Sequence, residues 1–219
     1  MVSERLEEIA RKIDDRNYDE VKLLLKEIEG DISKWRIEDR FALDLSRVKI
    51  RYYVDYDEES IELLLTNLEK LRTMDTPRLY YEYTTFIGEV FKNTKNFKKA
   101  IVYYKQALLD AEKRNDTLAV IFSYLKIGSC FYRVEYSDMS EYNENHVDSA
   151  WFCYNKALQF PENSKNNSLF SRIYDNLSRI AVSIGTIDVA ETYARKALKI
   201  NSANDNSFSI EPRCSNPKG

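Results

Sequence analysis

Apolar residues recur along most of this chain at the three- and four-residue spacing that is typical of amphipathic helices. In residues 3–15, for example, Leu6, Ile9 and Ile13 would lie on one helix face, with charged residues on the other. The same spacing predicts three more helices in the first third of the chain, over residues 21–28, 35–54 and 58–73. The pattern therefore predicts a helical N-terminal part.

Turn-forming residues separate these segments. Residues 17–19 predict a turn, and Gly30 predicts a helix end. Thr76 and Pro77 predict a helix start, with the threonine as N-terminal cap and the proline in the first turn. The chain of 219 residues has only 5 glycines and 4 prolines, which favours an all-α fold, because tight β-turns usually need such residues.

Three stretches after residue 80 repeat one pattern of small and large residues. In the first stretch the pattern is Gly88, Phe91, Ala100, Tyr104 and Ala107. The matching residues of the other two are Gly128, Phe131, Ala150, Tyr154, Ala157 and Ser178, Ala181, Ala190, Ala194, Ala197. Small residues let two helices approach closely, so each stretch predicts a tight helical hairpin. In the first two stretches we expect the large aromatic side chains to lie in the core. Because one hairpin cannot bury both of its faces, the hairpins are expected to stack.

This pattern resembles the tetratricopeptide repeat (TPR) family over about residues 80–200. Tyr124 and Tyr174 also fall where that family favours an aromatic residue early in the first helix. The resemblance implies a right-handed superhelical solenoid of antiparallel helix pairs, with about ten helices in five hairpins. The alanines at 100, 150 and 190 are 50 and 40 residues apart, whereas the usual period is about 34. We interpret the chain as a longer-period version, of about 40 residues per repeat.

The strength of the repeat predicts three parts. Residues 1–75 form degenerate N-terminal hairpins, residues 76–200 form three clear TPR-like hairpins, and residues 201–219 form a flexible polar tail. Extra residues at 135–147 interrupt the second clear hairpin. Two interpretations of this insertion stay open: a functional loop, or extra turns on the two helices that flank it.

Charge and hydropathy narrow the classes of partner. The net charge is −3, from 33 basic and 36 acidic residues. A protein that binds nucleic acid usually has an excess of basic residues, so we expect no nucleic-acid partner. One local basic run is interpreted as a solvated helix face and turn; it consists of Lys92, Lys95, Lys98, Lys99 and Lys105. No signal peptide or bilayer-spanning apolar stretch is visible, so we expect a cytoplasmic protein with no membrane partner.

The residues that usually carry catalysis or bind metals are scarce. His146 is the only histidine and is predicted to lie in a solvated loop. Three cysteines match no metal-ligand spacing, and Cys130 and Cys153 are expected to act as small apolar residues. The glycines form no phosphate-binding loop. We therefore expect no catalytic site, no metal and no cofactor.

The resemblance also implies where a partner would bind, because in TPR proteins the first helix of each hairpin lines the concave face. The inward positions implied in this chain are Glu82, Thr85, Glu89, Lys92, Phe122, Leu125, Ser129, Tyr132, Arg133, Arg172, Asp175, Arg179 and Val182. The groove would be acidic near Glu82, apolar in the middle and basic near Arg172, which suits a peptide with an apolar centre and an acidic end. The alternative is that these are ordinary solvated residues.

The leading functional hypothesis is a non-enzymatic module that binds a protein or peptide in this groove. The alternative is the peptide-sensing domain of a bacterial signalling or transcriptional regulator, which longer-period repeats with tyrosine-rich helices resemble. The resemblance to peptide-pheromone sensors also raises a response-regulator phosphatase, which would need a catalytic glutamine on an N-terminal bundle. Gln106 and Gln159 are instead predicted to lie on second helices of repeats, which argues against that enzyme. The sequence leaves the identity of the partner and the oligomeric state open.

Overall fold

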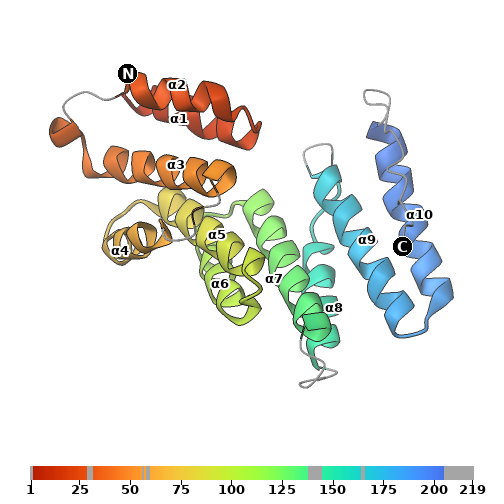
Figure 1. Ribbon diagram of the computed structural model, residues 1–219. Coiled ribbons are helices and arrows are strands. Elements are labelled where there is room, and N and C mark those ends of the chain that lie inside the picture. Colours follow the sequence, from red (N-terminus) through yellow and green to blue (C-terminus); the bar gives the residue numbers. More distant parts are fainter. Residues whose placement is uncertain are drawn as a thin grey trace, which may run out of the picture. The chain divides into compact units, whose positions relative to one another are not determined.

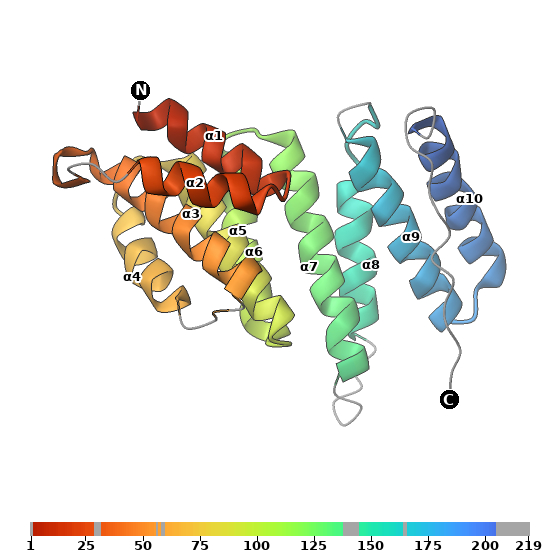
Figure 2. The same ribbon diagram turned by 45° about the horizontal axis from the view of Figure 1, so that its top comes forward.

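A computed structural model describes residues 2–28, 32–55, 57, 60–137, 145–163 and 166–204 (Figures 1 and 2). Within these ranges the chain forms ten α-helices and one short 3-10 helix, and it contains no strand. The all-α prediction is therefore confirmed. The helices divide into two units with their own internal contacts, Met1–Asp116 and Thr117–Gly219. This division by contacts differs from the division by repeat strength at residue 75, and each unit is described by itself.

The first unit contains six helices and the 3-10 helix Ile32–Lys34. The six helices are α1 (Val2–Asp14), α2 (Tyr18–Glu27), α3 (Ile37–Asp55), α4 (Ile61–Leu71), α5 (Pro77–Asn93) and α6 (Phe97–Lys113). Helices α1 and α2 form one antiparallel pair, and α5 and α6 form another (Figure 1). Helix α1 also packs along α3. The predicted helix over 35–54 begins at Ile37, because the 3-10 helix and a bend at Trp35 precede it. The predicted end at Gly30 lies outside the described residues.

Two apolar clusters hold the first unit together. One joins α1 to α2 and α3 through buried residues such as Ile9, Val21 and Leu43. The other joins α3 and α4 to α5, with Leu68 and Tyr83 among its buried members. The periodic apolar residues that predicted these helices are therefore the ones that form the core.

The second unit contains two hairpins, α7 (Thr117–Ser137) with α8 (Asn145–Ala157) and α9 (Asn167–Ser183) with α10 (Ile187–Asn204). Helix α9 packs on both α7 and α8, so the two hairpins stack. Helix α7 continues to Ser137 and α8 begins at Asn145, so both helices extend into the predicted insertion, whose residues 138–144 lie outside the described part. Helix α10 also continues beyond the predicted start of the tail at 201, and the rest of the tail, from residue 205, is not described.

The small residues of the repeat lie directly against the large ones. A Cβ atom added to Gly88 would lie 2.8 Å from Cε1 of Tyr104, and one added to Gly128 would lie 2.7 Å from Cε1 of Tyr154. Both tyrosines are almost fully buried, with exposures of 1% and 0%. In the third hairpin a larger residue, Ser178, stands at the glycine position, and a smaller one, Ala194, stands at the tyrosine position. The predicted close approach of paired helices is confirmed.

The other predicted core residues divide into two groups. Ala100, Ala150 and Ala190 are buried, as the hairpin pattern requires. Phe91 and Phe131 are only partly buried, although each packs against an apolar cluster of its unit. The ring of Phe91 stacks on Tyr103 with 5.5 Å between centroids.

His146 differs from its prediction as a loop residue. It lies in the first turn of α8, and its ring stacks on Phe131 with 6.1 Å between centroids. The prediction was wrong because α8 begins earlier than the polar residues around His146 suggested. Cys130 and Cys153 are buried and form no disulfide within the described residues, in line with their expected role as small apolar residues.

Four helix ends share one tight turn. Arg16, Lys95, Asn115 and Gly185 each have a positive φ, between 54° and 78°. In each turn the amide of the next residue donates to a carbonyl five positions earlier, for example Asn96 N to Phe91 O at 2.8 Å and Thr186 N to Ala181 O at 2.8 Å. This is the Schellman arrangement, which satisfies the last carbonyls of a helix and reverses the chain within a few residues.

The glycine–tyrosine contact generates the first prediction. Gly88→Ala should lower the free energy of unfolding by up to about 2 kcal/mol, because overpacking against the buried Tyr104 ring costs about 1–3 kcal/mol, whereas the gain in helix propensity is at most about 1 kcal/mol. In a Tyr104→Ala background the same change should be neutral or stabilising. Urea denaturation of the four variants of this cycle measures the coupling. Additive effects would contradict the interlock, and Gly128 with Tyr154 offers an independent repeat.

Candidate functional site

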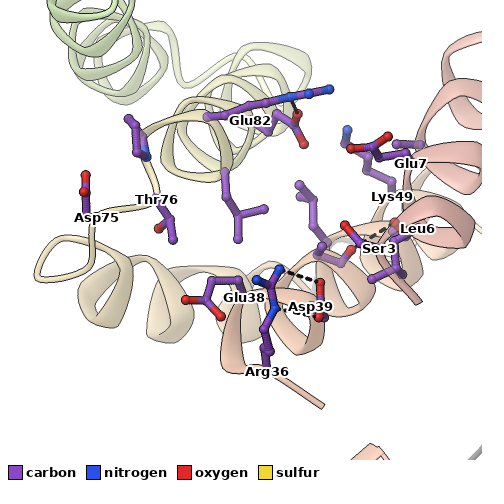
Figure 3. A pocket seen from close by; sticks show the side chains of 17 residues that line it. Ser3, Leu6, Glu7, Arg36, Glu38, Asp39, Lys49, Asp75, Thr76 and Glu82 are labelled. Atoms are coloured by element: carbon purple, nitrogen blue, oxygen red, sulfur yellow. Dashed lines mark hydrogen bonds and ion pairs between the residues drawn. The ribbon is translucent and has the colours of Figure 1, made fainter. Parts of the chain in front are cut away.

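The first unit has a pocket between the first helices of its hairpins (Figure 3). Its volume is about 460 Å³, and α1, α3 and the start of α5 line it. The floor is apolar and consists of Leu6, Ala10, Ala42, Leu45 and Leu79. The pocket therefore lies on the helices that the resemblance assigns to the partner-binding face.

Small and inward-bonded side chains keep the pocket open. Ala10 on α1 and Ala42 on α3 end at Cβ and leave space between the helices. Ser46, one turn after Ala42, donates its hydroxyl to the Ala42 carbonyl at 3.0 Å instead of extending outward. The buried Leu6 and Leu45 form the base of the pocket, with exposures of 5% and 3%. A partner group entering this space would leave water for an apolar surface.

Charged side chains surround the apolar floor. Five are carboxylates and three are cationic, namely Glu7, Glu38, Asp39, Asp75, Glu82 and Arg36, Lys49, Arg78. Two ion pairs neutralise part of this set: Arg36 Nε lies 3.2 Å from Asp39 Oδ2, and Arg78 Nε lies 3.2 Å from Glu82 Oε1. The hydrogen bond and the charge of Asp39 raise the pKa of Arg36. The remaining carboxylates outnumber the remaining cation, so the pocket is acidic.

A buried hydrogen-bond network fixes the helices behind the pocket. Tyr83 on α5 donates its hydroxyl to the Phe41 carbonyl of α3 at 2.7 Å. The side-chain amide of Asn67 on α4 donates both to that hydroxyl at 3.4 Å and to Asp44 Oδ2 at 2.9 Å. Burial raises the pKa of Tyr83 above its ordinary value. The network therefore ties α3, α4 and α5 together and sets the distance between two walls of the pocket.

Thr76 occupies the predicted cap position, but its side chain does not act as predicted. It immediately precedes α5, and Pro77 takes the first helical position. Its hydroxyl makes no cap hydrogen bond, and within the described residues the buried Oγ1 atom has no hydrogen-bond partner. The prediction of the helix start at Thr76 and Pro77 is therefore confirmed, whereas the prediction that the Thr76 hydroxyl caps the helix is wrong. Thr76 instead lines the pocket beside Asp75 (Figure 3).

Among the sequence-predicted residues of α5, only Glu82 lines this pocket. Thr85, Glu89 and Lys92 are half-buried farther along the same helix. Glu89 accepts a hydrogen bond from the Tyr53 hydroxyl of α3 at 3.4 Å. The C-terminal half of α5 is therefore partly covered by α3, and the open part of this face lies near the start of α5.

The predicted residues of α7 are mostly covered. Leu125 is 1% exposed and belongs to the core of the second unit, so its assignment to an open groove was wrong. Phe122 is half-buried, and the Lys126 ammonium lies 4.8 Å from its ring centroid. Ser129 and Tyr132 are also half-buried, and of the five only Arg133 is exposed.

The predicted residues of α9 are exposed, namely Arg172, Asp175, Arg179 and Val182. Arg179 Nε lies 3.3 Å from Asp175 Oδ2, so part of the predicted basic end is neutralised within the helix. These residues belong to the second unit and the pocket belongs to the first, so they are described as distinct candidate surfaces.

Sequence reasoning missed the half of the pocket that α1 and α3 contribute. The repeat is weak there, and no motif marks Glu7, Glu38 or Lys49 as neighbours. Their proximity follows from the packing of α1 on α3, which joins segments separated by α2. An acidic pair at the start of α3, Glu38 and Asp39, was the available signal, but acidic residues are common in the first turn of any helix.

The Tyr83 network generates the second prediction. Tyr83→Phe should lower the free energy of unfolding by about 1–3 kcal/mol at pH 7, because the buried Phe41 carbonyl loses its donor. A raised pKa means that neutral Tyr83 stabilises the fold fully below its ordinary pKa of 10.0 and loses this effect as the pH rises through the folded value. The stability difference between wild type and variant, measured by urea denaturation, should therefore narrow above pH 10. A constant difference would contradict the assignment, and Tyr81→Phe on the same helix is the control.

Comparison with known proteins agrees with this architecture. The family described as "Tetratricopeptide repeat" matches residues 81–109 and 171–204. A search of curated proteins by sequence gives no match. No described helix is long and apolar enough to cross a membrane.

Solved structures supply the fold over nearly the whole chain. BtubC (BKLC) from P. vanneervenii is 17% identical with a TM-score of 0.68, covering 99% of this chain and 94% of that one. Nearly identical TPR-like repeats attributed to a kinesin light chain of Podospora anserina are 11% identical with a TM-score of 0.64, covering 94% and 97%. At these identities the likeness concerns the fold alone. Residues 81–109 and 171–204 thus match the tetratricopeptide repeat, and the chain shares its fold with solved structures of TPR-like repeats.

Proposed function

We propose that this chain is a non-catalytic interaction module that holds a segment of a partner protein in the α1/α3/α5 pocket. Tetratricopeptide repeats indicate a protein–protein interaction module. The observation that carries the finer proposal is the pocket itself, which is apolar at its base, charged at its rim and built on first helices of successive hairpins.

The dimensions of the pocket suit a few side chains. Its volume of about 460 Å³ lies within the range of about 300–1,000 Å³ that is usual for ligand sites. Apolar bases bury anchor side chains of a partner, whereas polar rims orient the rest of the segment. A short peptide and a segment of a folded protein would use the pocket in the same way. The peptide-sensing alternative therefore differs only in where the bound segment comes from. A short peptide that co-purifies with the chain would favour peptide sensing, and a folded protein would favour the interaction module.

A second surface is the exposed face of α9. Arg172 and Arg179 are both exposed on it, and Arg179 is paired with Asp175 on the same face. We propose this face as an additional contact for acidic groups of the partner, since unpaired surface cations mainly guide association and orientation.

The pocket generates the third prediction. Ala42→Trp should fill the cavity and reduce partner affinity at least tenfold, because the indole would occupy the space of the bound segment. The partner is first captured from native extract, identified by mass spectrometry and purified, and calorimetry then measures its affinity. Thr66→Trp, at an exposed position on α4 outside both proposed surfaces, is the matched control. Equal affinity of the folded Ala42→Trp variant would overturn the proposal, and circular dichroism confirms that its helices are retained.

The α9 face generates the fourth prediction. Arg172→Ala should weaken binding of the same partner several-fold, and Arg179→Ala should weaken it less, because Arg179 is already paired with Asp175. Neither change should lower helicity, since both side chains are exposed. If both variants bind like wild type in calorimetry, the partner contact does not include α9.

A further inference from the structure

We infer that the α1/α3/α5 pocket recognises a basic segment, in which a lysine or arginine lies next to apolar residues. This inference rests on the proposed function and specifies the chemistry of the partner. Two properties of the pocket carry it: the charge that remains after internal pairing, and the position of that charge relative to the apolar floor.

The internal ion pairs use both arginines of the pocket. Arg36 is held by Asp39 through two hydrogen bonds, of 3.2 and 3.5 Å, from Nε and Nη2. Arg78 is held by Glu82 one turn away on α5. What remains at the rim is Glu7, Glu38 and Asp75 against one ammonium, that of Lys49. A cationic group would therefore find excess negative charge, whereas an anionic group would meet repulsion.

The remaining charges lie at different ends of the pocket (Figure 3). Glu38, Asp75 and Thr76 stand at one end, whereas Glu7 and Lys49 stand together at the other. The first end therefore has two carboxylates and no lysine. The cation nearest to Glu38 there is Arg36, which is already paired with Asp39 and whose pKa the charge of Glu38 also raises. Apolar side chains of the lining lie between the two ends (Figure 3).

A long cationic side chain fits this arrangement. Lysine and arginine pack their aliphatic stems on apolar surface while the charged head reaches polar groups at the edge. The stem would lie on Leu79 and Ala42, and the head would reach Glu38 and Asp75. Bonds between a cationic donor and a carboxylate are stronger than neutral ones, which gives the rim its selectivity.

The carboxylates do not make a metal site. Within the described residues, no group of three or more histidine, cysteine, aspartate or glutamate side chains is placed to hold a metal ion. The acidic residues instead stand on separate elements around an apolar floor.

The test uses the full chain and a library of displayed random 12-residue peptides as the probe. Selection at low salt should enrich peptides that have lysine or arginine beside leucine, isoleucine or phenylalanine. Synthetic peptides from the enriched set should bind Glu38→Lys and Asp75→Lys at least tenfold more weakly than wild type. Raising the salt from 0.05 to 0.5 M should also weaken them, because screening reduces exposed charge attraction. The matched controls are Glu62→Lys on α4 and Asp148→Lys on α8, which change the net charge equally outside the pocket.

The outcomes distinguish the basic chemistry of the partner from the use of the pocket as the binding site. Enrichment of acidic or uncharged peptides whose binding is blocked by Ala42→Trp would overturn the basic partner and keep the pocket as the binding site. Binding that is indifferent to Ala42→Trp, or no enrichment at all, would overturn both. Equal losses in the pocket and control variants would show a general charge effect, and this too would overturn the inference.

Discussion

The fold depends on how closely the two helices of each hairpin approach. At Gly88 and Gly128 there is no room for a side chain, because the ring of Tyr104 or Tyr154 occupies the place where a Cβ atom would lie. Each buried ring thus fills the space that the glycine leaves, and the packing is complete only when both residues have their proper size. The third hairpin shows that the constraint concerns the pair, since Ser178 there is accompanied by a small residue, and its hydroxyl bonds to the facing helix at Ala190 O, 2.9 Å away.

Tight hairpins leave their first helices to meet one another, and the pocket is a consequence of that arrangement. The large buried residues of α3 and α5, such as Phe41 and Tyr83, point into the shared core and are joined there by a hydrogen bond. The small residues Ala10 and Ala42 lie on the other side, so space remains between helices whose spacing is already fixed. The pocket is therefore held open by the core behind it, and a partner need not create it.

The sequence was sufficient for features that depend on local spacing. The Gly88–Tyr104 match, the buried alanines and the helix type followed from residues three, four or sixteen positions apart in one hairpin. The acidic pocket could not be found in this way, because Glu7 and Glu38 come together only through the packing of α1 on α3. The chemistry of Thr76 was also inaccessible, since a residue type suited to capping does not fix the backbone angles that capping requires.

The error at Leu125 shows why a repeat register alone does not locate a binding surface. Leu125 on α7 and Asp175 on α9 occupy the same register position, three residues before Gly128 and Ser178 respectively. Leu125 is buried because α9 packs over it, whereas Asp175 is exposed and bonds with Arg179. Equivalent positions of two repeats thus have an apolar side chain where another helix covers them and a charged side chain where they are exposed. A partner can use only the uncovered ones, so the open face near the start of α5 is a firmer basis for a binding site than the complete set of inward positions.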